Sequence, residues 1–231
     1  MNIPVAILAG GLATRMRPLT QKIPKSLLLV AGCPFIDHQL RYLQRQGIRS
    51  VVICTGFLGE MIQAHVQDGA QFGISVRYSS DGEHLLGTGG ALLRALPLLG
   101  QVFYVLYGDS YLPIEYSPIE QYFHLQSSMG LMTILRQNTK LHPSNVVFRQ
   151  GVITHYDKIK QSPEMEYIDY GLSILTAQAF GGFPVTFDLG DVFHSLALKN
   201  TLTGYEVFHR FYEIGSFDGL QETEKFLLNG K

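Results

Sequence analysis

Short apolar runs rich in β-branched and aromatic residues recur through the first half of the chain, at 5–8, 51–55, 74–79 and 102–107. Each run is too short for a helix and is typical of a buried strand. Between them lie stretches over 34–46, 58–67 and 88–99, and leucine and isoleucine recur at helical spacing most clearly in the first and last. Strands that alternate with helices predict a parallel sheet with right-handed crossovers.

The ends of two of these predicted helices carry boundary residues. Pro34 occupies a plausible first helical position, and Gly47 follows the last turn of the same helix. Thr88 is the expected N-cap of the helix over 88–99, because its hydroxyl can accept a hydrogen bond from a free backbone N–H.

The pattern changes after about residue 130. Strand-like runs follow one another more quickly there and predict antiparallel additions to the sheet, at 130–136, 145–149, 152–157 and 169–175. Helices are expected over 188–199 and 216–228. The predicted fold class is therefore α/β, with a mainly parallel central sheet and added antiparallel strands in the second half.

The composition narrows the function. The chain has 231 residues, 46% hydrophobic and 16% charged, with a formal net charge of -1. Without a basic excess a nucleic-acid partner is not expected. No apolar run approaches the ~20 residues of a membrane-spanning helix, so no membrane partner is expected either, and the cytoplasm is the expected location. Cys33 and Cys54 have no metal-ligand spacing and are expected to be reduced.

The segment "LAGGLATRMRPLTQKIPKSLL", residues 8–28, directly follows the first predicted strand and contains no acid. Adjacent glycines allow a ligand to approach the backbone, and successive N–H groups form an anion site. Arg15, Arg17 and Lys25 add positive charge suited to phosphate oxygens. The glycine spacing is neither that of the dinucleotide fingerprint nor that of the P-loop. On composition alone, an ordinary turn with solvated arginines is as good an interpretation as an anion-binding site.

This segment and several later ones together resemble the sugar-1-phosphate nucleotidylyltransferases. "LAGGLATRMRPLT" followed by "PKSLL" is similar to the signature loop of that family, with Ala13 in place of a usual glycine. Shorter segments resemble the later motifs in the same order: "GTGGAL", "YGDS", "YDKIK", "IDYGLSIL" and "FYEIGSFDGL". Heptose-1-phosphate guanylyltransferases are the nearest in general similarity, followed by N-acetylmuramate-1-phosphate uridylyltransferases.

The resemblance implies a single Rossmann-like nucleotidyltransferase domain over residues 1–231. Its nucleotide-binding half would cover about 1–110 and its sugar-phosphate-binding half about 111–231. The implied activity transfers a nucleoside monophosphate from a nucleoside triphosphate to a sugar 1-phosphate, giving a nucleotide sugar and pyrophosphate, with Mg²⁺ as cofactor. The two substrates are the expected partners, and whether the chain forms a homodimer is left open.

The same resemblance assigns roles to individual residues. Arg15 and Lys25 would be catalytic, and Asp109 and Glu213 would bind the metal. The nucleotide would be bound by Leu8, Ala9, Gly10, Gly11, Arg15, Glu83, Gly87, Thr88, Gly89 and Asp109. The sugar phosphate would be bound by Gly108, Lys158, Asp169 and Gly171. Most relatives have Asp where this chain has Glu213, so either the longer side chain reaches the metal or Asp109 and the phosphates hold it.

The base and the sugar are not determined by the sequence. Glu83 is the expected base contact, in a loop one residue longer than in relatives. Tyr156 falls where relatives use a glutamate against sugar hydroxyls, which leaves Asp169 as the main polar candidate.

Two other functions are weighed against the transferase. A catalytically silent nucleotide-sugar-binding regulator would be expected to have lost Arg15, Lys25 or Asp109, and all three are present. A GT-A glycosyltransferase needs a D-x-D metal motif, and "YGDSYL" supplies one acid.

Overall fold

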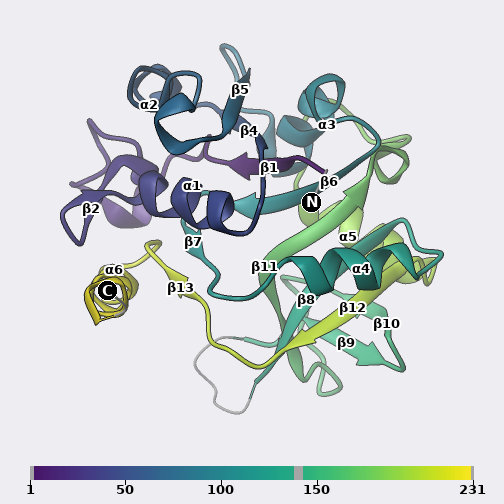
Figure 1. Ribbon diagram of the computed structural model, residues 1–231. Helices are drawn as coiled ribbons and strands as arrows, with labels where there is room; N and C mark the ends of the chain where they lie inside the picture. Colours follow the sequence, from purple (N-terminus) through teal and green to yellow (C-terminus); the bar gives the residue numbers. More distant parts are fainter. Residues whose placement is uncertain (1–2, 138–142, 230–231) are drawn as a thin grey trace.

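A nine-stranded sheet forms the centre of the molecule (Figure 1). The computed structural model describes residues 3–137 and 143–229. The strand order is β5-β4-β1-β6-β11-β8-β12-β10-β9, so strands from both predicted halves of the chain share one sheet. The division into two halves stays a prediction.

The first four strands of this order are parallel and confirm the runs read from the sequence. They are β5 (Ser75–Ser80), β4 (Ser50–Thr55), β1 (Val5–Leu8) and β6 (Val102–Tyr107). The helices α1 (Phe35–Arg45), α2 (Gly59–Val66) and α3 (Gly87–Leu99) connect them. The chain proceeds outward from β1 to β4 and β5 and then returns to β6 on the other side of β1. The switch point of the topology therefore lies between β1 and β6, where α/β sheets bind ligands.

The second half adds strands that are mostly antiparallel. β11 (Tyr167–Thr176) pairs antiparallel with β6 and with β8 (Gly130–Arg136). β12 (Leu202–Val207) is parallel to β8, and β10 (Val152–Tyr156) is antiparallel to both β12 and β9 (Val146–Arg149). β9 also pairs with the start of β11, so these five strands close on themselves.

The remaining elements cover the sheet and its edges. They are α4 (Ser117–His124), α5 (Leu189–Leu198), α6 (Phe217–Asn229), the short pairs β2 (Leu29–Val30) with β3 (Cys33–Pro34) and β7 (Ser110–Tyr111) with β13 (Tyr212–Glu213), and the 3-10 turns Thr14–Met16, Lys25–Leu27, Ala70–Phe72 and Ala177–Phe180.

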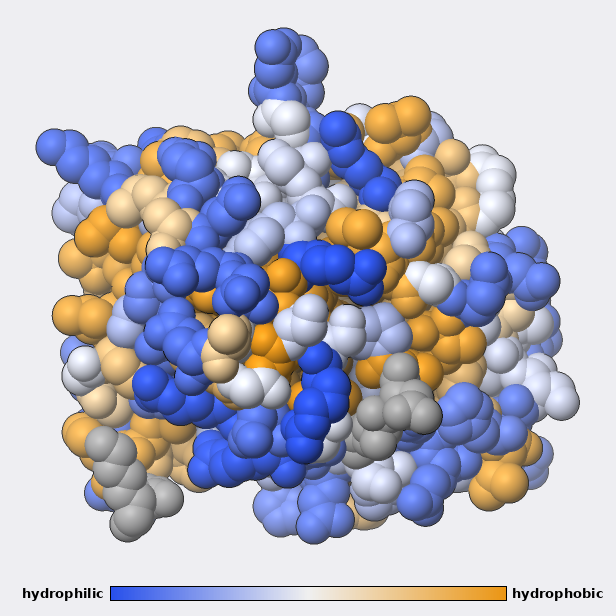
Figure 2. Space-filling view, turned by 45° about the horizontal axis from the view of Figure 1, so that its top comes forward, coloured by the Kyte–Doolittle hydropathy of each residue, from blue (hydrophilic) through white to orange (hydrophobic). Residues whose placement is uncertain are grey.

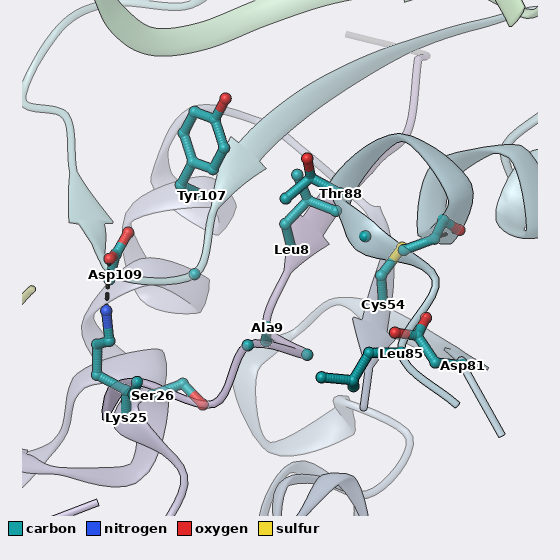
Figure 3. A pocket seen from close by; sticks show the side chains of 16 residues that line it. Leu8, Ala9, Lys25, Ser26, Cys54, Asp81, Leu85, Thr88, Tyr107 and Asp109 are labelled. Atoms are coloured by element: carbon teal, nitrogen blue, oxygen red, sulfur yellow. Dashed lines mark hydrogen bonds and ion pairs between the residues drawn. The ribbon is translucent and has the colours of Figure 1, made fainter. Parts of the chain in front are cut away.

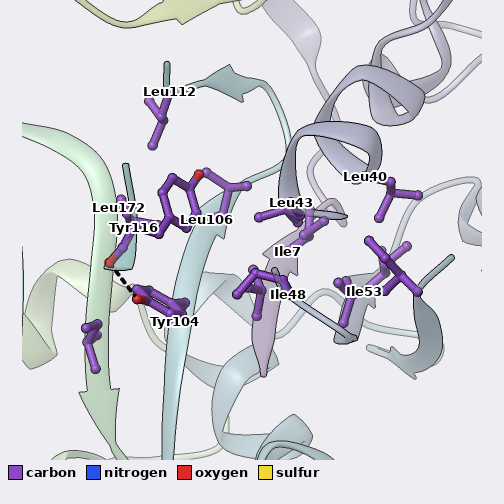
Figure 4. Close-up of a cluster of buried hydrophobic side chains, with 14 of the residues drawn as sticks. Ile7, Leu40, Leu43, Ile48, Ile53, Tyr104, Leu106, Leu112, Tyr116 and Leu172 are labelled. Atoms are coloured by element: carbon purple, nitrogen blue, oxygen red, sulfur yellow. Dashed lines mark hydrogen bonds between the residues drawn. The ribbon is translucent and has the colours of Figure 1, made fainter. Parts of the chain in front are cut away.

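Alternate residues of each strand bury into opposite faces of the sheet, as the period of a strand requires. In β1, Ile7 packs on the side of α1, α2 and α4, in the cluster that contains Leu40 and Leu43 (Figure 4). Ala6 packs on the other side, with apolar residues of α3 and α5. The result is a three-layer arrangement, with the sheet between two groups of helices.

The surface is mixed. On the face shown in Figure 2, hydrophilic residues interrupt the hydrophobic ones. Within the described ranges, no helix is both long enough and apolar enough to cross a bilayer.

Several details differ from the sequence predictions. Pro34, for example, is the N-cap of α1 and not its first residue. Leu86 is the N-cap of α3 and Gly87 its first residue, so the expectation that Thr88 caps this helix is wrong. α4 was not predicted, because only Ile119 and Phe123 of its eight residues are buried and the helical period is short. β12 was not predicted either, because Gly204 interrupts the sequence pattern of the strand. A side chain at this position would collide with the Phe148 ring.

Candidate active site

A cavity of about 220 Å³ opens at the switch point of the sheet (Figure 3). Its walls come from the ends of β1, β4 and β6, the loop after β1 and the start of α3. Sixteen residues line it: Leu8, Ala9, Gly10, Gly11, Ala13, Lys25, Ser26, Cys54, Asp81, Leu85, Gly87, Thr88, Ala91, Tyr107, Gly108 and Asp109. Nine of the residues predicted from the sequence are therefore brought together here.

The loop after β1 offers backbone donors to this cavity. The N–H groups of Gly10 and Gly11 have no hydrogen-bond partner among the described residues, whereas the N–H of Ala9 donates to the carbonyl of Cys54. Gly10 also allows the segments that follow β1 and β4 to lie close together, since a Cβ there would lie 3.0 Å from the backbone nitrogen of Gly56. Free N–H groups beside a cavity are suited to bind an anion.

Ala13 turns the loop in the left-handed conformation, with φ of 47°. Its carbonyl accepts hydrogen bonds from the Met16 N–H and the Thr20 hydroxyl, at 3.0 and 2.8 Å. A glycine would adopt this conformation without the steric conflict of a Cβ. The methyl group of Ala13 therefore lies at a position whose backbone conformation favours glycine.

Lys25 and Asp109 form an ion pair at one end of the cavity. Lys25 Nζ lies 2.8 Å from Asp109 Oδ2, and the two side chains are 18% and 28% exposed. Asp109 follows the end of β6, and Gly108 before it leaves room for β1, because a Cβ there would lie 2.7 Å from the carbonyl oxygen of Leu8. The pair joins the glycine-rich loop to β6, across the switch point.

Gln39 of α1 supports the turn that carries Asp109. Its buried side-chain amide donates to the carbonyls of Tyr107 and Ser110, at 2.9 and 2.8 Å. These carbonyls lie on either side of Gly108 and Asp109. Sequence reasoning did not single out Gln39, because this contact spans about seventy residues of chain.

Arg15 and Glu213 meet Asp109 around Gly215. A Cβ on Gly215 would lie 2.3 Å from Glu213 Oε2 and 3.4 Å from both Arg15 Nη2 and Asp109 Oδ2. The pairing of β13 with β7 brings Glu213 beside Ser110, the neighbour of Asp109. Arg15 is exposed and does not line the cavity, and it forms no ion pair with another described residue.

The carboxylates of Asp109 and Glu213 fit a Mg²⁺ ion by the chemistry of their oxygens. Glu213 already accepts hydrogen bonds from the Gly215 N–H and the Ser216 hydroxyl, at 2.6 and 2.9 Å. A carboxylate has further lone pairs, so these bonds leave it able to bind a cation. No group of three or more His, Cys, Asp or Glu side chains gathers within the described part of the chain. Most ligands of such a metal would have to come from the substrates.

The opposite end of the cavity contains Asp81 instead of the expected Glu83. Asp81 is buried and lines the cavity beside Cys54 and Leu85, while Glu83 is exposed and does not line it. Asp81 Oδ2 accepts a hydrogen bond from the Leu86 N–H at 3.2 Å. Burial raises the pKa of the Asp81 carboxyl, against the Leu86 N–H and the charge of Arg94, which lower it. The unusual length of this loop was visible in the sequence, but the side chain that faces inward was not.

The glycines at the start of α3 differ in what they contact. Gly87 lines the cavity with Thr88. The N–H of Gly89 donates to the carbonyl of Phe187 at 3.0 Å, and a Cβ on Gly89 would collide with the Phe187 ring. Gly89 does not line the cavity, so its role in this structure is close packing of α3 against the segment before α5.

Lys158, which the sequence predicts to bind the sugar phosphate, does not line the cavity and pairs with a residue that sequence reasoning missed. Lys158 Nζ lies 2.9 Å from Oδ1 of Asp188, the N-cap of α5. Asp188 also accepts a hydrogen bond from the Thr88 hydroxyl at 3.0 Å. Burial raises the pKa of Asp188, but Lys158, Gly190 and Thr88 together hold it below its usual value. An N-cap aspartate before 189–199 was a possible signal, but its lysine partner was not.

Asp169 and Gly171 lie at an irregularity of β11, where the register with β8 shifts. Gly171 has φ of 106°, and its N–H donates to Asp169 Oδ1 at 3.0 Å. Burial raises the pKa of Asp169 to about 6, against Lys158 and the Gly171 N–H, which lower it. The Tyr156 hydroxyl is buried and has no hydrogen-bond partner among the residues that the structure describes. Burial raises the pKa of Tyr156, and the charge of Asp169 raises it further.

Comparison with known proteins agrees with this geometry. The family model described as Nucleotidyl transferase matches residues 5–161. An N-acetylmuramate alpha-1-phosphate uridylyltransferase of Neisseria meningitidis is 42% identical over 112 residues, 48% of each chain. A D-glycero-alpha-D-manno-heptose 1-phosphate guanylyltransferase of Campylobacter jejuni is 30% identical over 179 residues, 77% of each. The matched segment thus spans about half the length of the first relative and three quarters of the second.

Solved structures show the same fold. The crystal structure of HddC from Yersinia pseudotuberculosis superposes with a TM-score of 0.81, covering 97% of this chain and 99% of that one, at 21% identity.

Proposed function

The chain belongs to the nucleotidyl transferase family, and from that premise we propose that it transfers a nucleoside monophosphate from a nucleoside triphosphate to a sugar 1-phosphate. The products are a nucleotide sugar and pyrophosphate. The observation that carries the proposal is the Lys25–Asp109 pair at the switch-point cavity, beside the free N–H groups of Gly10 and Gly11.

The triphosphate lies along the loop after β1. The N–H groups of Gly10 and Gly11 donate to its phosphate oxygens, and Lys25 neutralises the α-phosphate from the cavity wall. Arg15 is placed outside the cavity, next to Gly215, where a departing pyrophosphate would meet solvent. Its guanidinium stabilises the charge that accumulates on that leaving group.

The reaction needs no protein base. The attacking oxygen of the sugar 1-phosphate is already anionic near neutral pH, so the protein has to hold two anions together and offset their charge. Lys25 stands between the two phosphates, and Lys158 approaches from the sugar side. Both lysines have an aspartate partner in this structure, which keeps their Nζ groups in place before the substrates bind.

Asp109 and Glu213 would hold a Mg²⁺ ion near Gly215. When bound, the ion would offset negative charge on the triphosphate. Because the part of the chain that the structure describes contributes only these two carboxylates here, the metal would bind together with the nucleotide.

Asp81 is the residue that we assign to the base. It is the buried carboxylate at the end of the cavity opposite Asp109, so it can accept N–H groups from the edge of a base. The guanine edge offers two adjacent N–H donors, whereas uracil offers one between two carbonyl oxygens that a carboxylate repels. GTP is therefore the proposed nucleotide. Asp169 is assigned to hydroxyl groups of the sugar, beside Gly171.

A panel assay tests the proposal. Four nucleoside triphosphates are combined with a set of sugar 1-phosphates, and phosphate is measured after addition of pyrophosphatase. At least one pair is expected to release pyrophosphate in a metal-dependent manner. A protein that binds nucleotide sugars in calorimetry but releases no pyrophosphate with any pair would instead be the silent binding protein.

A further inference from the structure

Asp188 stands between two segments, of which one lines the cavity and the other lies outside its lining. Thr88 lies at the start of α3 and lines the cavity, while Lys158 follows β10 on the sugar side. The Asp188 carboxylate uses one oxygen for each: Oδ2 accepts from the Thr88 hydroxyl at 3.0 Å, and Oδ1 accepts from Lys158 Nζ at 2.9 Å. It therefore links segments seventy residues apart in the sequence.

The link is fixed by further bonds. The Leu189 N–H donates to Thr88 Oγ1 at 2.8 Å, and the Gly190 N–H donates to Asp188 Oδ1 at 2.7 Å. Gly190 has no room for a side chain, since a Cβ would lie 2.8 Å from Asp188 Oδ1 and 3.4 Å from the Lys158 side chain. The first turn of α5 thus holds the carboxylate in one orientation, and the carboxylate holds the lysine.

The network also faces the known cavity. Tyr107 lines that cavity. Burial raises the pKa of Tyr107, and the charges of Asp169, Asp188 and Asp109 raise it further. The charge of Lys158 lowers the pKa of Asp169, against the effect of burial. Because Asp188 Oδ1 lies 2.9 Å from Lys158 Nζ, the carboxylate determines where the lysine points.

We propose that Asp188 is a positioning residue that holds Lys158 for the phosphate of the sugar 1-phosphate and ties it, through Thr88, to the nucleotide-binding start of α3. The inference rests on the proposed function. It predicts that a change on the nucleotide side, at Thr88, alters affinity on the sugar side.

Asp188 also caps α5, and a serine separates the two roles. Asp188→Ser keeps an oxygen that can accept from the Gly190 N–H, since serine is as good an N-cap as aspartate, but it removes the charge next to Lys158. Asp191→Asn removes a charge in the first turn of the same helix and is the matched control, because among the described residues Asp191 forms no ion pair or hydrogen bond with Lys158.

Steady-state kinetics on the full chain provide the first readout. Asp188→Ser is expected to raise KM for the sugar 1-phosphate about tenfold, the loss of roughly one charged contact, with KM for the triphosphate nearly unchanged. Asp191→Asn should match the wild type. In a Lys158→Ala background, Asp188→Ser should have no further effect, because the residue it positions is gone.

A second pair of variants tests the link to α3. Thr88→Val should raise KM for the sugar 1-phosphate, and Thr88→Ser, which keeps the hydroxyl, should restore it. Thermal unfolding accompanies every variant, and Asp188→Ser is expected to unfold close to the wild-type temperature.

Several outcomes would overturn the proposal. An unchanged or lowered KM in Asp188→Ser would mean that Asp188 does not position Lys158, or that it competes with the phosphate for it. Additive effects of Asp188→Ser and Lys158→Ala would separate the two residues. Calorimetric titration with inorganic phosphate distinguishes these failures from failure of the proposed function, because weaker phosphate binding in Asp188→Ser and Lys158→Ala, but not in Asp191→Asn, requires no turnover.

Discussion

Two lysine–aspartate pairs, one lining the cavity and one outside its lining, differ mainly in their surroundings. Lys25–Asp109 and Lys158–Asp188 have nearly the same separation, 2.8 and 2.9 Å. The side chains of the first pair are 18% and 28% exposed, and those of the second are 40% and 53% exposed. Solvent screens the outer pair much more than the inner one. We therefore expect the inner ion pair to hold its side chains more rigidly than the outer ion pair does.

The elements that carry the pairs differ in the same way. Asp109 follows the end of β6 and is supported by the Gln39 amide from behind. Lys158 lies in a loop after β10, and its partner is a helix cap. Loops vary more easily than strand ends. We infer that changes in the accepted sugar are accommodated on the outer side, with the inner pair kept constant.

Breaking the inner pair should have the largest effect. Asp109→Asn removes the charge that pairs with Lys25 and one of the two candidate metal carboxylates. Turnover is expected to fall at least ~10²-fold, on the scale of one lost electrostatic contact to a transition state. Steady-state pyrophosphate release measures this effect, and chelation by EDTA should abolish the wild-type activity. Full activity in EDTA would contradict the metal site at Asp109 and Glu213.

Breaking the outer side should affect one substrate. Lys158→Ala is expected to raise KM for the sugar 1-phosphate about ten- to a hundredfold, since one charged contact is worth roughly 1.5–3 kcal/mol. KM for the triphosphate should stay nearly constant. Lys160→Ala is the matched control, as an exposed lysine two residues further along. Equal effects of the two substitutions on both substrates would remove Lys158 from the site.

The base end of the cavity sharpens the comparison, because Asp81 belongs to the rigid side. Asp81→Asn replaces one acceptor oxygen by a donor and should lower kcat/KM for GTP about tenfold relative to UTP. Glu83→Gln makes the same kind of change two residues away on an exposed side chain and should leave the ratio unchanged. A panel that favours UTP in the wild type and is insensitive to Asp81→Asn would show that the base is recognised elsewhere.

The smallest expected effect concerns stability on the sugar side. Burial raises the pKa of Asp169 from 3.8 to about 6. Between these values the folded chain keeps a proton that the unfolded chain releases, so stability falls as the pH rises through this window. Asp169→Asn removes that penalty and should raise the unfolding temperature at pH 7.5 by about 2–4 °C, with little gain near pH 4.

The control for this prediction is kinetic. If Asp169 contacts the sugar, the more stable Asp169→Asn variant should bind the sugar 1-phosphate more weakly. A variant that gains stability and keeps its KM would show that Asp169 is buried for structural reasons alone.

The parallel half of the fold could be predicted because β1, β4 and β6 are short apolar runs and β5 alternates polar and apolar residues. The residues at the ends of these strands, such as Gly10 and Asp109, follow from the same pattern, since carboxyl ends meet at one edge. α4 and β12 could not be predicted, because only two residues of α4 are buried and Gly204 breaks the apolar pattern of β12.

The missed residues depend on the three-dimensional path of the chain. Gln39 and Asp188 act through contacts with segments far along the chain, and Asp81 is set apart from its exposed neighbours by its burial at the cavity. The N-cap position of Asp188 is visible in the sequence, but its contact with Lys158 is not. Glu83 was the expected base contact, but it shares its loop with Asp81, and only the three-dimensional path shows which side chain faces inward.

The pairing of β11 with β6 constrains how the molecule can be divided. Residues 172–176 of β11 cover the edge of β6 that faces away from β1. A fragment that ends near residue 110 would retain β6 but leave this apolar edge bare, and bare edges pair with other chains. The nucleotide-binding segment is therefore expected to aggregate when produced alone. Exchange of sugar specificity between relatives should succeed by grafting surface loops around an intact β6–β11 seam, and fail when the chains are joined between these two strands.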